Sequence, residues 1–387
     1  MSCCKCQNTF TGWAIQIGLL TGRSVSKQAV FDRIGEGATA FAQGLLQKIL
    51  LQQSAKGFVE GLFSAFGKVL LHDSTTLKLP QSLSAIFPGN RNHLKQYAVA
   101  RIQSIIDVKA MRFINFMLGS FTQNDQSASG SILQWARKGD LVIRDMGYFV
   151  IDTFAKLAKA KVYFLSRLKY GVKLYDKQGN EIGLKKLLKG NRAVDQWVFI
   201  GVKKRVWVRL VMLPVPAEQR AERVRKAKHE RDKRVNHNKQ YYQWLGYSVY
   251  ITNVEKKVWT PKEVAKAYGV RWQIEIIFKS WKTGFHLQDM LHEGCTNEHR
   301  VRVSIFLMLL FICLFMQKIY MRYKARIEGI EERFISLLKL SVFIGNNLKE
   351  IFSLPDKQLK EIISRHCCYD KRYDRRNMTD LYQNFKN

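Results

Sequence analysis

The chain has 387 residues, of which 64 are lysine or arginine and 31 are aspartate or glutamate, so its formal net charge is +33. Hydrophobic residues make up 47% and aromatic residues 12% of the sequence. This composition excludes an intrinsically disordered chain and indicates a sizeable core with one or two further domains. The basic excess predicts a polyanionic partner, either a nucleic acid or an acidic membrane surface.

The longest apolar stretch is the segment 303–316, VSIFLMLLFICLFM, with basic residues on both sides. Its 14 residues are fewer than the roughly 20 that a membrane-spanning helix needs, so we predict a buried core helix. The N-terminal residues do not form a basic stretch followed by an apolar one, and we expect no secretion signal.

The sequence contains seven cysteines, an odd number that includes adjacent pairs and makes a poor disulfide framework. We therefore predict free thiols in a reducing, cytoplasmic environment. A zinc site built from the terminal cysteines is less favoured, because their spacing matches no known ligand pattern.

In chain order, residues 1–66 are predicted to be helical. Ser26 is a suitable N-cap for a helix that ends near residue 34, and the segment 37–51 has apolar residues at helical spacing. Two such helices form either a helix-turn-helix or part of a plain helical bundle.

Strand patterns begin at Gly67. A helix is expected at 149–160 among these strands, and this order of elements indicates an α/β layer. The four strands are predicted at 67–80, 98–106, 140–147 and 162–165.

From about residue 166 to 250 the pattern becomes richer in strands. The segment 197–213 is typical of a hairpin that turns at a lysine pair, and 247–254 is predicted to be a further strand. Between them, 217–239 holds nine lysines or arginines against four acids at helical spacing. Such a run is either a solvated helix face or a surface that follows the phosphates of a nucleic acid.

After this β-rich part, helices are predicted again. A helix over 261–282 begins at a proline, the apolar segment 303–316 follows, and residues 326–387 are helical and charged.

Three acidic residues stand out by position. Asp73 and Asp145 each end an apolar strand, and the sites of open α/β sheets lie beyond the carboxyl ends of strands. Acids at such places are often turn residues or helix caps. The third acid, Glu275, lies on the helix predicted over 261–282.

On that helix, Tyr268, Arg271, Glu275 and Lys282 fall on one stripe about 60° wide at 100° per residue. Apolar residues occupy the adjacent face, so the stripe presents a carboxylate between hydrogen-bond donors. The structural alternative is a simple ion pair between Arg271 and Glu275 at the i, i+4 spacing.

The segment 268–282, YGVRWQIEIIFKSWK, matches Y-x2-R-x3-E-x6-K and resembles the signature of DDE transposases in family four of bacterial insertion sequences. HDSTTLKLP, which contains Asp73, and VIRDMGYF, which contains Asp145, resemble the family's first and second catalytic segments. The interval of 130 residues between Asp145 and Glu275 holds a β-rich insertion in the family, where this chain also turns β-rich. The resemblance covers about residues 67–325.

The chemistry of the three acids agrees with this resemblance. Three converging carboxylates repel one another without a cation, and hard ions such as Mg²⁺ prefer carboxylate and water ligands. We therefore expect Asp73, Asp145 and Glu275 to hold two Mg²⁺ ions, for which Mn²⁺ substitutes. Two such ions activate a water or a 3′-hydroxyl and stabilise the leaving oxygen at phosphorus.

The resemblance implies the remaining roles. Tyr268, Arg271 and Lys282 would contact DNA phosphates near the cleavage site. The enzyme would cut at the terminal inverted repeats of its element and join the freed 3′-hydroxyl to target DNA, in cut-and-paste transposition. The working form would be a homodimer on two paired DNA ends, in the bacterial cytoplasm at the nucleoid.

The implied fold is α/β: a ribonuclease H-like core interrupted by a β-rich insertion, with helical ends. The expected regions are an N-terminal DNA-end-binding region at 1–66, the first part of the core at 67–165, the insertion with its basic helix at 166–250, the second part of the core at 251–325, and a C-terminal helical region at 326–387.

Other functions remain as alternatives. A standalone Mg²⁺-dependent nuclease or resolvase would share the core, and a catalytically inactive, transposase-derived protein would only bind DNA. Among single residues, His72 is expected to fill space at a strand end, and Asp107 competes with Asp145 for the second acid. Trp244 and Tyr247 are candidates for stacking a flipped base, but core packing is the favoured interpretation of both.

Overall fold

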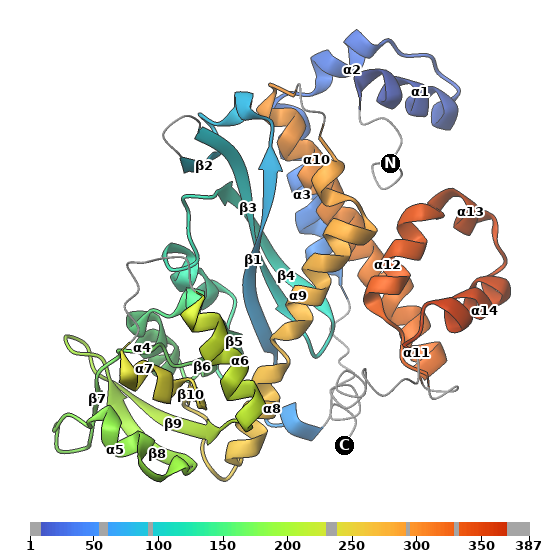
Figure 1. The fold of residues 1–387 in the computed structure, drawn as a ribbon. Coiled ribbons are helices and arrows are strands. Elements are labelled where there is room, and N and C mark those ends of the chain that lie inside the picture. Colours follow the sequence, from blue (N-terminus) through green and yellow to red (C-terminus); the bar gives the residue numbers. More distant parts are fainter. Residues whose placement is uncertain are drawn as a thin grey trace. The chain divides into compact units, whose positions relative to one another are not determined.

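The computed structural model is a mixed α/β protein whose described residues include ten strands and many helices (Figure 1). It describes residues 9–53, 61–91, 96–229, 238–291, 295–328 and 333–369. The chain divides into two compact units. The first comprises 1–58, 73–124 and 272–383, and the second comprises 59–72, 125–271 and 384–387. Within the described residues the chain passes between the units at three places: inside one strand after His72, after Asn124 and after Arg271.

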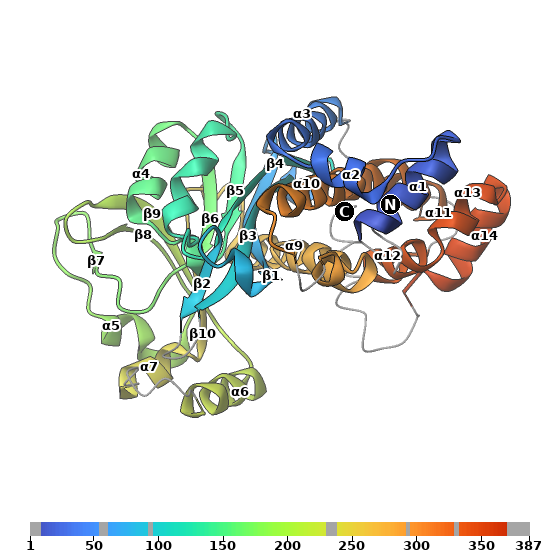
Figure 2. The ribbon, with the colours of Figure 1, turned by 90° about the horizontal axis from the view of Figure 1, so that it is seen from above.

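The first unit begins with three helices, which confirms the helical prediction for this part of the chain. The side chains of Thr9 and Ser26 cap the first two helices by accepting hydrogen bonds from Gly12 N and Ala29 N. The third helix lies against α10 (Glu298–Leu314), and Figure 2 shows the two side by side. The three helices are α1 (Phe10–Thr21), α2 (Lys27–Arg33) and α3 (Glu36–Gln52).

The strands of the first unit include an antiparallel hairpin of β3 (Gln96–Asp107) and β4 (Arg112–Ser120). The short β2 (Pro88–Arg91) pairs with β3, whose other neighbour is β1 (Val69–Leu79). The strand predicted at 98–106 is therefore confirmed, whereas β2 and β4 were not predicted.

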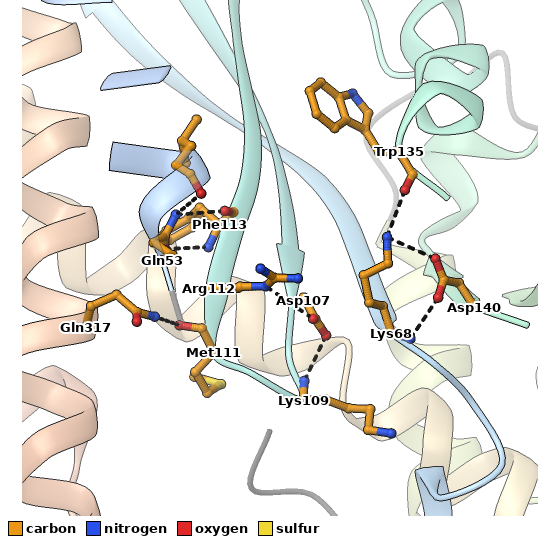
Figure 3. Close-up of polar contacts among 11 residues, drawn as sticks. Gln53, Lys68, Asp107, Lys109, Met111, Arg112, Phe113, Trp135, Asp140 and Gln317 are labelled. Carbon is orange, nitrogen blue, oxygen red and sulfur yellow. Dashed lines mark hydrogen bonds and ion pairs between the residues drawn. The ribbon is translucent and has the colours of Figure 1, made fainter. Parts of the chain in front are cut away.

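The side chains of two residues stabilise this hairpin through polar contacts (Figure 3). Gln53, directly after α3, donates to the carbonyl of Phe113 at 2.9 Å and accepts from its N–H at 3.1 Å. Asp107, which is 3% exposed, accepts from the N–H of Lys109 at 3.2 Å and lies 3.6 Å from the Arg112 guanidinium. The carboxylate of Asp107 therefore stabilises the β3–β4 turn, which is the role of a turn residue.

The apolar segment 303–316 lies in a longer helix than predicted. From Glu298 to Glu328 the chain is helical for 31 residues, through α10, a π-helical segment and α11 (Met321–Glu328). By length and composition this one helix of the described residues could cross a membrane, but 61% of its most apolar window is buried inside the protein. The predicted length was wrong because the helix continues into charged sequence on both sides, and the prediction of a buried segment is confirmed.

The C-terminal helices complete the first unit. They are α12 (Leu337–Asn346), α13 (Leu348–Ser353) and α14 (Asp356–His366). Helix α12 packs on the π-helical segment Ser280–Gly284, where a Cβ atom on Gly284 would stand 2.3 Å from Ser341 Oγ. Only glycine permits this approach.

The sheet of the second unit begins with β1 and continues, in spatial order, with β5 (Leu141–Arg144), β6 (Tyr163–Arg167), β10 (Tyr247–Thr252), β9 (Val206–Pro214), β8 (Val194–Ile200) and β7 (Leu174–Tyr175). The first residues of β1 pair in parallel with β5, and β5 pairs in parallel with β6. Every residue of β5 is buried, as expected for a parallel strand covered on both faces. Helix α4 (Ile151–Lys159) packs against β6, and the ring centroids of Phe154 and Phe164 are 4.9 Å apart.

The predicted strands and hairpin of this unit are confirmed. The hairpin of β8 and β9 turns at Lys203 and Lys204, and β10 joins it to β6.

Three further helices of the second unit come between these strands in the chain. They are α5 (Leu184–Leu188), α6 (Ala217–Lys228) and α7 (Lys239–Trp244). Helix α6 has no buried residue, which confirms a basic, exposed helix at the start of the segment 217–239. Residues 230–237 of that segment lie outside the described residues.

The long helix predicted over 261–282 is wrong. The chain forms α8 (Pro261–Gly269), leaves the helix at Val270 and Arg271, and starts again as α9 (Trp272–Lys279) before the π-helical segment Ser280–Gly284. At the break the N–H of Arg271 donates to the carbonyl of Tyr268 at 3.0 Å, a tight i→i−3 bond that ends α8. The predicted stripe required one uninterrupted helix at a uniform 100° per residue, and the chain does not form such a helix across the signature.

Candidate active site

Asp73 lies inside β1, so the prediction that it ends a strand is wrong. The strand continues to Leu79 because Thr75, Leu77 and Leu79 alternate inward as buried residues. The pairing of β1 with β5 does end here, since His72↔Arg144 is its last pair and Asp73 is the next residue. One carboxylate oxygen of Asp73 accepts the N–H of Ser74 at 2.8 Å, which orients the side chain.

Asp145 directly follows the last residue of β5, so the prediction for this acid is confirmed. Its backbone is extended, with φ −78° and ψ 166°, and it precedes a short 3-10 turn at Met146–Tyr148. The Asp145 side chain makes no capping hydrogen bond to that turn and is 40% exposed. The carboxylate is thus presented at the end of the strand and is not used as a helix cap.

Two signature residues reach Asp145 within the second unit. The Tyr268 hydroxyl donates to Asp145 Oδ1 at 3.4 Å, and Arg271 Nε lies 3.8 Å from the same oxygen. The Arg271 guanidinium also lies over the ring of Tyr268, 5.9 Å from its centroid. Burial, together with the negative charge of Asp145, raises the pKa of Tyr268, so the hydroxyl stays protonated and donates.

The other signature residues belong to the first unit. Glu275 lies in the first turn of α9 and is half-buried, next to the buried Ile274. Lys282 lies in the π-helical segment after α9, where partial desolvation of its ammonium lowers its pKa. The structure thus brings Asp145, Tyr268 and Arg271 together in the second unit, and it assigns Asp73, Glu275 and Lys282 to the first.

The three predicted metal ligands have suitable chemistry. All are carboxylates, and each is at least partly accessible to solvent, as ligands of a hard, hydrated cation must be. Within the parts of the chain that the structure describes, no group of three or more His, Cys, Asp or Glu residues is gathered closely enough to hold a metal ion.

Other sequence candidates belong to the core. Trp244 is 9% and Tyr247 is 5% exposed, in agreement with core packing. Four described cysteines are buried and form no disulfide bond: Cys295, Cys313, Cys367 and Cys368. The three N-terminal cysteines lie outside the described residues.

Sequence reasoning missed Arg144, the residue before Asp145. It is fully buried and contacts His72, the residue before Asp73, at 3.0 Å. An arginine at the end of the otherwise apolar strand LVIR was the available signal.

Residues 64–316 match the family described as "Transposase DDE domain", and the chain belongs to this family. It is an enzyme that cleaves and transfers DNA strands, and its function is that of a transposase of a bacterial insertion sequence.

The chain is similar to named transposases. The transposase for insertion sequence element IS231F of Bacillus thuringiensis subsp. israelensis is 27% identical over 395 aligned positions, which cover 94% of this chain and 82% of that protein. The transposase for IS1151 of Clostridium perfringens is 24% identical over 361 positions, 86% of this chain and 74% of that protein. Among solved structures, the piggyBac transposase synaptic complex with hairpin DNA has a TM-score of 0.38 and 11% identity, over 80% of this chain and 59% of that one.

Proposed function

We propose that the protein catalyses cut-and-paste transposition of the insertion sequence that encodes it, by cleavage at the element's ends and attack of the freed 3′-hydroxyl on target DNA. The observation that supports this most is the contact of Tyr268 and Arg271 with Asp145, because it joins the signature segment to the second acidic segment. The match to the DDE domain spans both segments.

In this proposal Asp73, Asp145 and Glu275 hold two Mg²⁺ ions, and Mn²⁺ can replace them. Bound metal would activate the attacking oxygen and stabilise the leaving one. The protein's own contribution is orientation. The N–H of Ser74 holds the carboxylate of Asp73, while Tyr268 and Arg271 approach a single oxygen of Asp145 and leave the other for a further ligand.

Tyr268, Arg271 and Lys282 would bind phosphates beside the scissile bond. The Arg271 side chain is 13% exposed and is supported by the ring of Tyr268 and by Asp145. Such support limits the rotamers of the guanidinium, whose planar set of donors matches two phosphate oxygens. Lys282 would act as a point charge.

The finer assignments follow the same proposal. The parallel strands β1, β5 and β6, the antiparallel hairpin of β3 and β4, and helix α4 support a ribonuclease H-like core. We also propose membership of family four, the five sequence regions named above, action as a homodimer on two paired DNA ends, and a place in the bacterial cytoplasm at the nucleoid.

The test of this function is cleavage of linear DNA that carries the inverted repeats flanking the gene. We expect Mg²⁺-dependent breaks at the outer ends of the repeats, followed by joining to a target plasmid. Equal cutting of DNA without the repeats would instead indicate a standalone nuclease. Binding of the repeats without any cleavage in Mg²⁺ or Mn²⁺ would indicate an inactive DNA-binding protein.

The basic excess predicts a steep salt dependence of non-specific DNA binding. The logarithm of the affinity falls with the logarithm of salt concentration, with a slope of about −0.9 per phosphate neutralised. If α6 follows the phosphates, Lys228→Gln in its last turn should reduce the slope by about 1. Fluorescence anisotropy with a labelled duplex measures both quantities. A nearly flat line for the unaltered protein would contradict a DNA-binding role for the basic surface.

A further inference from the structure

A buried guanidinium lies directly behind Asp145. Arg144 has no exposed surface, and its Nη1 donates to Ser129 Oγ at 2.8 Å. Its Nη2 donates to the carbonyl oxygen of Ser129 at 2.5 Å and lies 3.0 Å from Nδ1 of His72. Both the guanidinium and the His72 ring lie over Tyr148, with centroid distances of 5.4 Å and 4.3 Å.

The contact between Arg144 and His72 determines the form of the imidazole. Arginine has only donors, so Nδ1 of His72 must accept, and His72 is neutral with its proton on Nε2. The same two residues are Cα partners in the parallel ladder of β1 and β5. Their contact therefore ties the two strands together at the last shared rung, after which Asp73 and Asp145 follow in the chain.

Arg144 differs from Arg209, which is also fully buried and belongs to the same unit. Arg209 forms a two-pronged ion pair with Asp195, at 2.8 and 3.1 Å, and donates to two carbonyls. Among the described residues Arg144 makes no ion pair and donates to Ser129 and His72 instead. A buried cation without an acidic partner is costly for stability, so the hydrogen bonds of Arg144 to Ser129 and His72 are what hold it in place.

We propose that Arg144 and His72 are positioning residues for strand cleavage. This inference rests on the proposed role of Asp145 as a metal ligand. Successive side chains of an extended chain point to opposite faces, so Arg144, held by Ser129 and His72 on one face, sets the direction in which Asp145 leaves on the other. A substitution at His72 can remove the hydrogen-bond acceptor of Arg144 Nη2 and leave the side chain of Arg144 itself unchanged.

The test compares His72→Asn with His72→Leu. The two substituents have nearly the same size and both remove the ring, but only asparagine keeps an acceptor near the position of Nδ1. We expect His72→Asn to cleave within about threefold of the unaltered protein. His72→Leu should cleave at least about tenfold more slowly, because misplacement of a reacting group by about 1 Å costs up to 100-fold. The affinity of the His72→Leu variant for Mn²⁺, measured by electron paramagnetic resonance without DNA, should fall several-fold. Its affinity for DNA ends should stay within about twofold of that of the unaltered protein.

All rates are compared per folded molecule, well below the lowest melting temperature. The matched control is Arg209→Lys, which alters the buried arginine that pairs with Asp195 and should change stability but not Mn²⁺ affinity. Equal cleavage and Mn²⁺ affinity in the Asn and Leu variants would overturn the proposal. If His72→Leu does not fold, Ser129→Ala is the second variant. It removes the Oγ that accepts from Arg144 and that also donates to Tyr148 and Thr153. A cleavage rate per folded molecule equal to that of the unaltered protein would overturn the proposal as well.

The Asp145→Asn variant separates this inference from the proposed function. If Asp145→Asn cleaves normally, the assignment of the metal ligands fails, and the positioning role fails with it. If Asp145→Asn is inactive while the Asn and Leu variants of His72 behave alike, only the positioning role fails.

Discussion

Replacing Asp73 or Asp145 by asparagine, or Glu275 by glutamine, is expected to abolish strand cleavage and leave DNA-end binding nearly unchanged. An amide keeps the shape of the side chain but removes the charge that a hard cation requires. Loss of several kcal/mol of transition-state stabilisation corresponds to a decrease of about a thousandfold or more. Cleavage assays in Mg²⁺ and Mn²⁺ beside gel shifts measure the two effects separately.

Asp107→Asn is the matched control for these three variants. Asp107 is an acid of the same sequence region, but its carboxylate holds the β3–β4 turn through Lys109 and Arg112. The control should therefore lower the melting temperature and leave the cleavage rate per folded molecule unchanged. Near-normal cutting by any one of the three test variants would remove that residue from the metal site.

Lys282→Ala and Arg271→Lys are expected to reduce the cleavage rate about 100-fold with a nearly unchanged melting temperature. A phosphate held by these side chains would lose its position, and a displacement of about 1 Å has an effect of this size. Arg271→Lys keeps the charge beside Asp145 but loses the planar pair of donors. If Lys282 were only a solvated lysine, its replacement would cost about 0.5 kcal/mol or less of stability and leave the rate intact. If Arg271 were only the ion-pair partner of Asp145, Arg271→Lys would lower stability and leave the rate per folded molecule intact.

Lys279→Ala is the control for Lys282→Ala, because Lys279 is an exposed lysine at the end of α9 that the signature does not include. Single-turnover cleavage rates and thermal melting of all variants decide the question. Unaltered cleavage by both Lys282→Ala and Arg271→Lys would mean that these residues are structural, and the proposed site would then rest on the three acids alone.

Features set by neighbouring residues were predictable from the sequence. The apolar run before Asp145 predicted β5 and an acid at its end, and the alternation around Lys203 and Lys204 predicted the hairpin of β8 and β9. Both patterns arise because adjacent residues of a strand face opposite environments, which the order of polar and apolar residues records directly. The identities and spacing of the four signature residues and of the two aspartates were likewise readable, and all six residues lie within the range that matches the DDE domain.

Tertiary packing decided the features that span long distances in the sequence. The break between α8 and α9 invalidated the helical stripe, and Arg271 lies near Asp145, which is 126 positions earlier in the chain. The contact of Arg144 with His72 joins residues 72 positions apart. The periodicity of apolar residues shows only which face of a single segment is buried and which is exposed. Which distant side chain fills a buried position depends on how the strands and helices pack, and the sequence of a single segment does not contain that information.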